Sequence, residues 1–185
     1  MLLEEGIVKI KGENEEPFTL KSGKKSRLFI DIKEACSNPT ILTEIVYSIR
    51  EQLTILGNTK SLKFNLIGSV AVGGISIGSV LLFIYLYDWY LLYPHIIVRT
   101  EKNDRGTQTK IIGDCKGKTV VLIEDVATSG GSIIDAVQAI RDAGGICDDV
   151  IVVVDREEGA KERCDKVGLN LISVLKKSDF GIRDI

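Results

Sequence analysis

Two adjacent carboxylates, Glu124 and Asp125, stand between an apolar run and a short loop of small hydroxyl-bearing residues and glycines. The apolar run at residues 120–123 is mostly β-branched, which predicts a buried parallel strand. The loop at residues 128–132 is then expected at the carboxyl end of that strand, and residues 133–140 continue as an apolar-periodic helix. Glycines let backbone N–H groups approach an anion, while hydroxyl donors and a helix N-terminus favour it further. The loop is therefore expected to bind phosphate.

The two carboxylates have a different task from the loop, because they would repel a phosphate. Carboxylate oxygens suit the hydroxyls of a vicinal diol or a bound cation. In this order, loop and acids would hold a phosphorylated ribose. The alternative is a plain helix N-cap and tight turn after an ordinary strand. The loop alone does not separate the two interpretations, and the paired acids favour a binding site.

The bulk composition is that of an ordinary globular protein and predicts one domain. The 185 residues are 44% hydrophobic and 27% charged, with a net charge of −2 and no extended basic block. This balance does not favour a nucleic-acid or membrane-surface partner. The four cysteines form no C-x-x-C pair and His95 is the single histidine, so neither a zinc site nor a Cys–His nucleophile is expected. Glu4 and Glu5 argue against a signal peptide, and we expect a cytoplasmic location.

One uncharged segment, residues 66–87, is long enough to raise the alternative of a membrane span. Glycine and serine crowd its first half, whereas its second half is bulky and aromatic. That division favours a strand, a glycine loop and a buried helix in succession. No cluster of lysine or arginine flanks the segment, so we expect no membrane partner.

Apolar and polar segments alternate along the chain and predict a parallel sheet covered by helices on both faces. Further strands are predicted at residues 27–32, 64–67, 96–99, 150–154 and 169–174, and a helix at residues 39–56 begins after Asn38. Ligands bind at the carboxyl ends of parallel strands. Three such ends carry chemistry here: residues 68–74, 124–132 and 155–156. The polar stretch at residues 100–114 predicts a long mobile loop of the kind that often forms a lid.

The central motif at residues 120–132 resembles the phosphoribosyl pyrophosphate signature of the type I phosphoribosyltransferases. Residues 20–31 resemble the N-terminal hood motif of the orotate phosphoribosyltransferases, and residues 155–160 are similar to the orotate-side segment of that family. The flexible catalytic loop of the family is matched by Arg99, Glu101, Asp104 and Gly106. The resemblance implies the α/β fold of the type I phosphoribosyltransferases, a parallel sheet with an N-terminal hood. A single domain would comprise a hood at about residues 1–38 and a core at about 39–185.

The resemblance implies transfer of ribose 5-phosphate from phosphoribosyl pyrophosphate to orotate, a step of pyrimidine biosynthesis. It implies Lys102 and Asp125 as catalytic residues. The implied residues for phosphoribosyl pyrophosphate are Lys21, Arg99, Lys102, Arg105, Glu124, Asp125, Val126, Ala127, Thr128, Ser129, Gly130, Gly131 and Ser132. Those for orotate are Lys21, Phe29, Thr128 and Arg156. Mg²⁺ is the implied cofactor, held through the substrate near Asp125 without a direct protein ligand. A homodimer is implied, with loop 100–114 shared across subunits.

Arg156 supplies a planar, permanently charged fork that suits the carboxylate of orotate. The alternative for this side chain is a surface ion pair with Glu157 or Glu158. The other motifs favour the ligand role.

The loop and the neighbouring glycine segment depart from the family pattern. Thr100, Asn103 and Arg105 replace two lysines and a histidine, and Lys102, the only lysine between Arg99 and Gly106, comes one place early. Val72 and Ser76 stand where the family commonly has Thr and Pro, and Gly73 takes the place of a lysine found in some members, although others have the same Gly-Gly. A second hypothesis therefore stands beside the enzyme: a nucleotide sensor or regulator that binds phosphoribosyl pyrophosphate without turnover. A transferase for another base is disfavoured by Arg156.

Overall fold

The computed structural model describes residues 8–12, 15–19, 25–58, 63–99 and 110–181. A central sheet of six strands is ordered β10-β9-β8-β5-β6-β7. The strands are β5 (Leu66–Val70), β6 (His95–Val98), β7 (Ile111–Ile112), β8 (Thr119–Ala127), β9 (Ile146–Asp155) and β10 (Asn170–Lys176). All neighbouring pairs are parallel except β6 and β7, which are antiparallel. The predicted α/β architecture with a mainly parallel sheet is confirmed.

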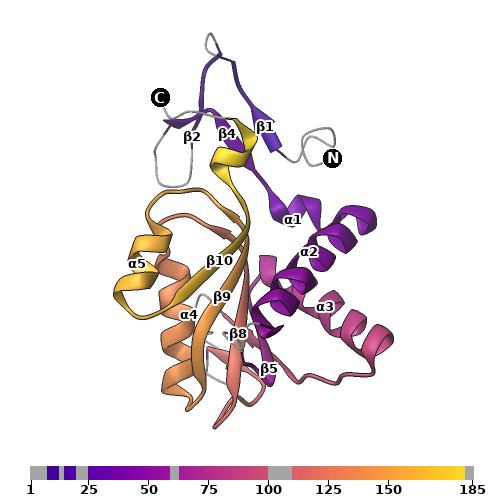
Figure 1. Cartoon of the computed structure of the whole chain (residues 1–185). Helices are drawn as coiled ribbons and strands as arrows, with labels where there is room; N and C mark the ends of the chain where they lie inside the picture. The colour runs from indigo at the N-terminus through magenta and orange to yellow at the C-terminus, as the bar shows by residue number, and fades with distance from the viewer. Residues whose placement is uncertain (1–7, 13–14, 20–24, 59–62, 100–109, 182–185) are drawn as a thin grey trace.

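Helices cover both faces of this sheet (Figure 1). One face packs against α2 (Pro39–Asn58) and α3 (Gly73–Trp89), the other against α4 (Gly131–Asp142) and α5 (Ala160–Lys166). Side chains alternate along β8, because successive residues of a strand point to opposite faces. Val121 and Ile123 enter the cluster with α2 and α3, whereas Val120 and Leu122 enter the cluster with α4. Burial on both faces explains why the strand is apolar without interruption.

The start of α2 follows the cap signal in the sequence. Asn38 Oδ1 accepts hydrogen bonds from the backbone N–H groups of Thr40 at 3.0 Å and Ile41 at 3.3 Å. Pro39 occupies the first helical position, where no N–H is needed. The predicted beginning of this helix is therefore confirmed.

A small N-terminal part lies above one end of the sheet (Figure 1). Strand β1 (Val8–Ile10) pairs antiparallel with β4 (Leu28–Ile30), and β2 (Phe18–Thr19) with β3 (Lys25–Ser26). The four-residue helix α1 (Ile32–Ala35) follows β4 and leads into α2. Its buried Ile32 and Ala35 belong to the same core cluster as α2 and α3. The N-terminal strands, which we call the hood, are thus joined to the sheet through α1.

Several predicted boundaries were wrong. The strand predicted at 27–32 ends at Ile30, because Asp31 caps α1 there. The strand predicted at 64–67 runs on to Val70, and Gly68 lies inside it, where a Cβ would stand 3.0 Å from Val120 Cγ1 and 3.2 Å from Leu122 Cδ1. The segment predicted as loop through residue 114 includes β7, an edge strand beside β6.

The uncharged segment at residues 66–87 contains a strand followed by a helix, as predicted. Its glycines, however, lie in β5 and α3 rather than in a loop, and the helix predicted as buried exposes Phe83, Leu86 and Tyr87. Helix α3 has 17 residues. Within the residues that the structure describes, no helix is both long and apolar enough to span a bilayer.

Candidate active site

Three strand ends meet at one edge of the sheet. Strands β5, β8 and β9 are neighbours and run parallel. Ala127 lies opposite Asp155, so β8 and β9 end level with each other. Ser69 lies opposite Ile123, so β5 ends earlier, beside the acid pair. The Ala71–Val72 turn after β5, the loop after β8 and the turn after β9 therefore face a common space. The sequence predicts this meeting of the three strand ends.

The loop at residues 128–130 leads directly into α4. Gly130 has a left-handed φ of +77°, and its carbonyl accepts from the N–H of Ile134 at 3.1 Å to open the helix. A side chain at position 130 would stand 3.2 Å from the Cα of Ala160. Glycine is required here both by the conformation and by the close packing against the start of α5.

The hydroxyl groups of this loop are available to a ligand. Among the described residues, the side chains of Thr128, Ser129 and Ser132 have no hydrogen-bond partner, while the carbonyl of Ser129 accepts from Arg163 Nη1 at 2.9 Å. A loop held by its backbone, with its hydroxyls and a helix N-terminus free, is suited to an anion.

Glu124 and Asp125 lie within β8 rather than after it, because the strand continues to Ala127 beside β9. Both are nearly buried, with exposed fractions of 5% and 7%. Glu124 Oε1 accepts from the N–H of Asp125 at 3.1 Å, and Asp125 Oδ1 accepts from the N–H of Val126 at 2.9 Å.

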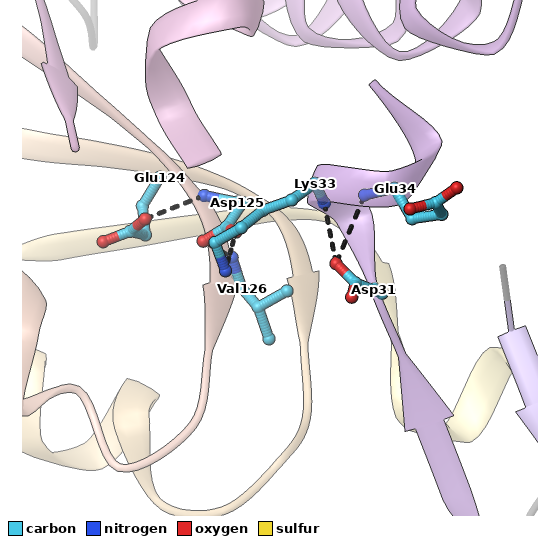
Figure 2. A network of polar contacts seen from close by, with 6 residues as sticks. All are labelled: Asp31, Lys33, Glu34, Glu124, Asp125 and Val126. Atoms are coloured by element: carbon cyan, nitrogen blue, oxygen red, sulfur yellow. Dashed lines mark hydrogen bonds and ion pairs between the residues drawn. The ribbon is translucent and has the colours of Figure 1, made fainter. Parts of the chain in front are cut away.

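A lysine from the hood side completes this group (Figure 2). Lys33 of α1 places Nζ 3.1 Å from Asp125 Oδ2. Burial opposes the charge of Lys33, yet the carboxylate of Asp125 raises the pKa of Lys33 overall. Burial also raises the pKa of Glu124 far above its ordinary value, and the neighbouring Asp125 adds to this effect. The buried position of Glu124 next to Asp125 therefore favours the protonated form of Glu124, and the ammonium group of Lys33 lies against the Asp125 carboxylate.

The N-terminus of α3 closes the other side of Asp125. A Cβ at Gly73 would overlap the Asp125 carboxylate, and one at Gly74 would stand 2.6 Å from the carbonyl oxygen of Ile123. The preceding Ala71–Val72 peptide bond is cis, and Val72 is exposed. The two glycines are thus needed for α3 to approach β8.

Arg156 follows β9 directly, and its N–H donates to the carbonyl of Ala127 at 2.9 Å. Its side chain is 12% exposed and pairs with Glu158 at 2.9 Å, which is one of the ion pairs considered as its alternative role. Its buried Nε has no hydrogen-bond partner among the described residues. The ion pair with Glu158 uses Nη2, and a guanidinium has five N–H donors, so Arg156 keeps donors beyond those of this pair.

The structure brings Glu124, Asp125, the loop at 128–130 with the first residues of α4, and Arg156 to the same sheet edge. The predicted loop at 128–132 is thus shorter than expected, because Gly131 and Ser132 begin the helix. Arg99 follows β6, and its N–H donates to the carbonyl of Lys110 at 2.8 Å. Phe29 lies in β4 with its ring 5.5 Å from that of Phe18, a contact within the hood. Lys21, Lys102 and Arg105 lie outside the described residues.

Sequence reasoning did not identify Lys33. Asp31 with Glu34 three residues later is a helix-start pattern and could have revealed α1. The contact with Asp125 had no local signal, because it joins two segments far apart in the chain.

Comparisons with known proteins agree with this geometry. The family model described as "Phosphoribosyl transferase domain" matches residues 69–183. The orotate phosphoribosyltransferase of Methanopyrus kandleri is 40% identical over 185 residues, covering 100% of this chain and 91% of the relative. That of Methanocaldococcus jannaschii is 43% identical over 159 residues, covering 85% and 83%. The solved structure of orotate phosphoribosyltransferase from Aeropyrum pernix matches with a TM-score of 0.77 at 28% identity, covering 96% of this chain and 92% of that one.

The match to the Methanopyrus kandleri relative extends over the whole chain, and the fold agrees with the Aeropyrum pernix structure over 96% of it. The identity and coverage exceed what a shared fold alone would produce. The chain belongs to the orotate phosphoribosyltransferase family, within the phosphoribosyl transferase domain family.

Proposed function

We propose that this protein transfers ribose 5-phosphate from phosphoribosyl pyrophosphate to orotate, forming orotidine 5′-monophosphate and pyrophosphate in pyrimidine biosynthesis. One observation supports the proposal above all. The loop after β8, whose hydroxyl groups are free to bind phosphate, lies at the same sheet edge as the buried acid pair and Arg156. Membership of the orotate phosphoribosyltransferase family supports the choice of substrates.

Each part of the site has a task in this proposal. The N–H groups and hydroxyls of residues 126–132 hold the 5′-phosphate, with the N-terminus of α4 behind them. Asp125 and Glu124 hold the ribose hydroxyls, and Arg156 with Thr128, Phe29 and Lys21 holds orotate. Arg99, Lys102 and Arg105 stabilise charge on the departing pyrophosphate. Catalysis then rests on oriented charges and excluded water rather than on a covalent intermediate.

The acid pair also fits a role for Mg²⁺. Among the described residues, no three acidic, histidine or cysteine side chains gather as a metal cage. Carboxylates near a diol and a pyrophosphate suit Mg²⁺, which commonly keeps waters and binds through substrate oxygens. When bound, the ion would neutralise the pyrophosphate as it leaves. Asp125 would lie near the ion and would hold the ribose hydroxyls in place.

A homodimer is part of the proposal, supported by an apolar surface at the end of α3 and the turn after it. Its large exposed side chains are Phe83, Leu86, Tyr87, Trp89, Tyr90, Leu91 and Leu92. Contiguous exposed apolar surface of this kind is typical of an interface. We propose that a second copy of this chain covers it and that loop 100–114 reaches the neighbouring site. Analytical sedimentation of wild type and of Tyr87→Glu tests this proposal. The wild type should sediment as a dimer and the variant as a monomer.

Two further elements belong to the proposal. The hood at about residues 1–38 and the core at about 39–185 act as one domain. A cytoplasmic location is proposed because all four cysteines are free thiols, as is usual in a reducing compartment.

The decisive experiment follows orotate consumption by absorbance with phosphoribosyl pyrophosphate and Mg²⁺. Turnover that requires both substrates is expected. Binding of phosphoribosyl pyrophosphate without turnover would favour the sensor instead.

Mixing Lys102→Ala with Arg156→Ala subunits should restore part of the activity, because a shared loop lets one site in the mixed dimer keep both residues. If a stable mixed dimer forms and shows no restored activity, the loop is not shared between subunits.

A further inference from the structure

The backbone of Lys33 is held by a helix cap. Asp31 Oδ1 accepts hydrogen bonds from the N–H groups of Lys33 at 3.1 Å and Glu34 at 3.2 Å. On the same short helix, Ile32 and Ala35 are buried in the core. The cap and the two buried side chains fix α1, and the side chain of Lys33 extends from it to Asp125, as Figure 2 shows.

Lys33 engages the carboxylate oxygen that the strand does not use. Asp125 Oδ1 accepts from the N–H of Val126, while Oδ2 lies 3.1 Å from Lys33 Nζ. The Asp125 side chain is 10% exposed and that of Lys33 is 58% exposed. The carboxylate is thus held at both oxygens, with the lysine on its solvent side.

An ordinary surface ion pair is the alternative, and such pairs add little to stability. Two observations favour a more specific role. Asp125 is nearly buried beside a second acid, Glu124, so an uncompensated charge there would be costly. The N-terminus of α3 has no room for a side chain toward Asp125, because a Cβ at Gly73 would overlap the carboxylate. Among the described residues, the positively charged group that contacts the Asp125 carboxylate is Lys33 of α1.

We propose that Lys33 is a positioning residue of the active site, which holds the Asp125 carboxylate in the orientation that receives the ribose hydroxyls. The inference rests on the proposed function. Lys33 acts through Asp125 and does not contact the substrate. Since α1 joins the hood to the sheet, the same ion pair fixes the hood relative to the ribose-binding edge.

The first test compares Lys33→Met with Lys33→Arg, and with Lys9→Met as a control on an exposed lysine of hood strand β1. Calorimetry measures the Kd for phosphoribosyl pyrophosphate, and steady-state kinetics measure KM and kcat. Lys33→Met should raise Kd and KM for phosphoribosyl pyrophosphate about tenfold, the lower end expected for a charge-assisted hydrogen bond. The value of kcat at saturation and the KM for orotate should change much less. Lys33→Arg should restore most of the affinity, and Lys9→Met should match wild type.

The second test is a double-mutant cycle with Asp125→Asn, read by ligand-detected NMR so that weak binding is measurable. If Lys33 acts through Asp125, Lys33→Met should cost nothing further in the Asp125→Asn background. A full additional loss there would mean that Lys33 binds the substrate itself and would overturn the proposal. Should Lys33→Met fail to fold, Asp31→Ala serves instead. By loosening the cap, Asp31→Ala should raise the same Kd by a smaller factor.

The outcomes separate this inference from the function on which it rests. A wild-type protein that turns over orotate, together with a Lys33→Met variant of unchanged KM, overturns the inference alone. A wild-type protein that neither binds phosphoribosyl pyrophosphate nor consumes orotate overturns the proposed function and the inference with it.

Discussion

Gly130 lies directly against Ala160, so that a Cβ at position 130 would stand 3.2 Å from the Cα of Ala160. The two residues belong to the loop before α4 and the start of α5. The N–H of Arg156, hydrogen-bonded to the carbonyl of Ala127 at 2.9 Å, joins the same two segments. The phosphate-type loop and the Arg156 turn are therefore packed as one unit.

Gly130→Ala should weaken binding of phosphoribosyl pyrophosphate and lower the melting temperature. Its left-handed φ of +77° alone costs alanine about 1 kcal/mol, and contact with Ala160 must displace the loop further. Gly117→Ala is the matched control, since Gly117 has φ of +69° but nothing within 4 Å of its Cβ position. Calorimetry should find weaker binding only in Gly130→Ala. Equal affinity in both variants would contradict a binding role for the loop.

Arg156→Ala should raise the KM for orotate far more than that for phosphoribosyl pyrophosphate. A charge-assisted hydrogen bond is worth about 1.5–3 kcal/mol, or roughly ten- to a hundredfold. Arg141→Ala, which removes an ion pair with Asp148 elsewhere on the surface, should leave both constants unchanged. If both KM values rise together in Arg156→Ala, the arginine is structural.

Glu124→Gln should stabilise the free protein increasingly as pH rises. Burial raises the pKa of Glu124 to about 9 from 4.5 in the unfolded chain. The folded state thus holds the extra proton, and its stability declines between these two values. The amide does not ionise, so the melting-temperature gap between variant and wild type should widen from pH 5 to pH 9. Glu51→Gln, on the exposed surface of α2, should show no such widening.

His95→Gln should remove a loss of stability at acid pH. The His95 ring is half-buried, with Nε2 2.8 Å from Ser69 Oγ, and burial lowers the pKa of His95 below its usual 6.5. The unfolded chain therefore binds the proton more readily, and stability falls as pH drops below about 6.5. Between pH 7.5 and pH 5, the urea midpoint of the wild type should fall more than that of His95→Gln. As the chain has one histidine, a constant difference would mean that His95 keeps an ordinary pKa.

Local sequence patterns were sufficient to predict the strands and helices that surround the site. The apolar run before Glu124, the Asn38–Pro39 cap and the alternation of strands with helices predict a parallel sheet, because burial and capping act over a few residues. Parallel strands bring their carboxyl ends to one edge, so the meeting of the β5, β8 and β9 ends followed as well. The motifs along the chain were equally sufficient for its family.

Only the tertiary structure decided how far the strands run and which side chains meet. Glu124 and Asp125 belong to β8 because β9 offers hydrogen-bonding partners beside them, with Val152 opposite Glu124. Lys33 meets Asp125 because α1 packs its apolar residues into the core beside β8. The raised pKa of Glu124 depends on burial, which the sequence does not display. Such contacts join residues that are distant in the chain, and the energy that selects them is that of packing the whole core.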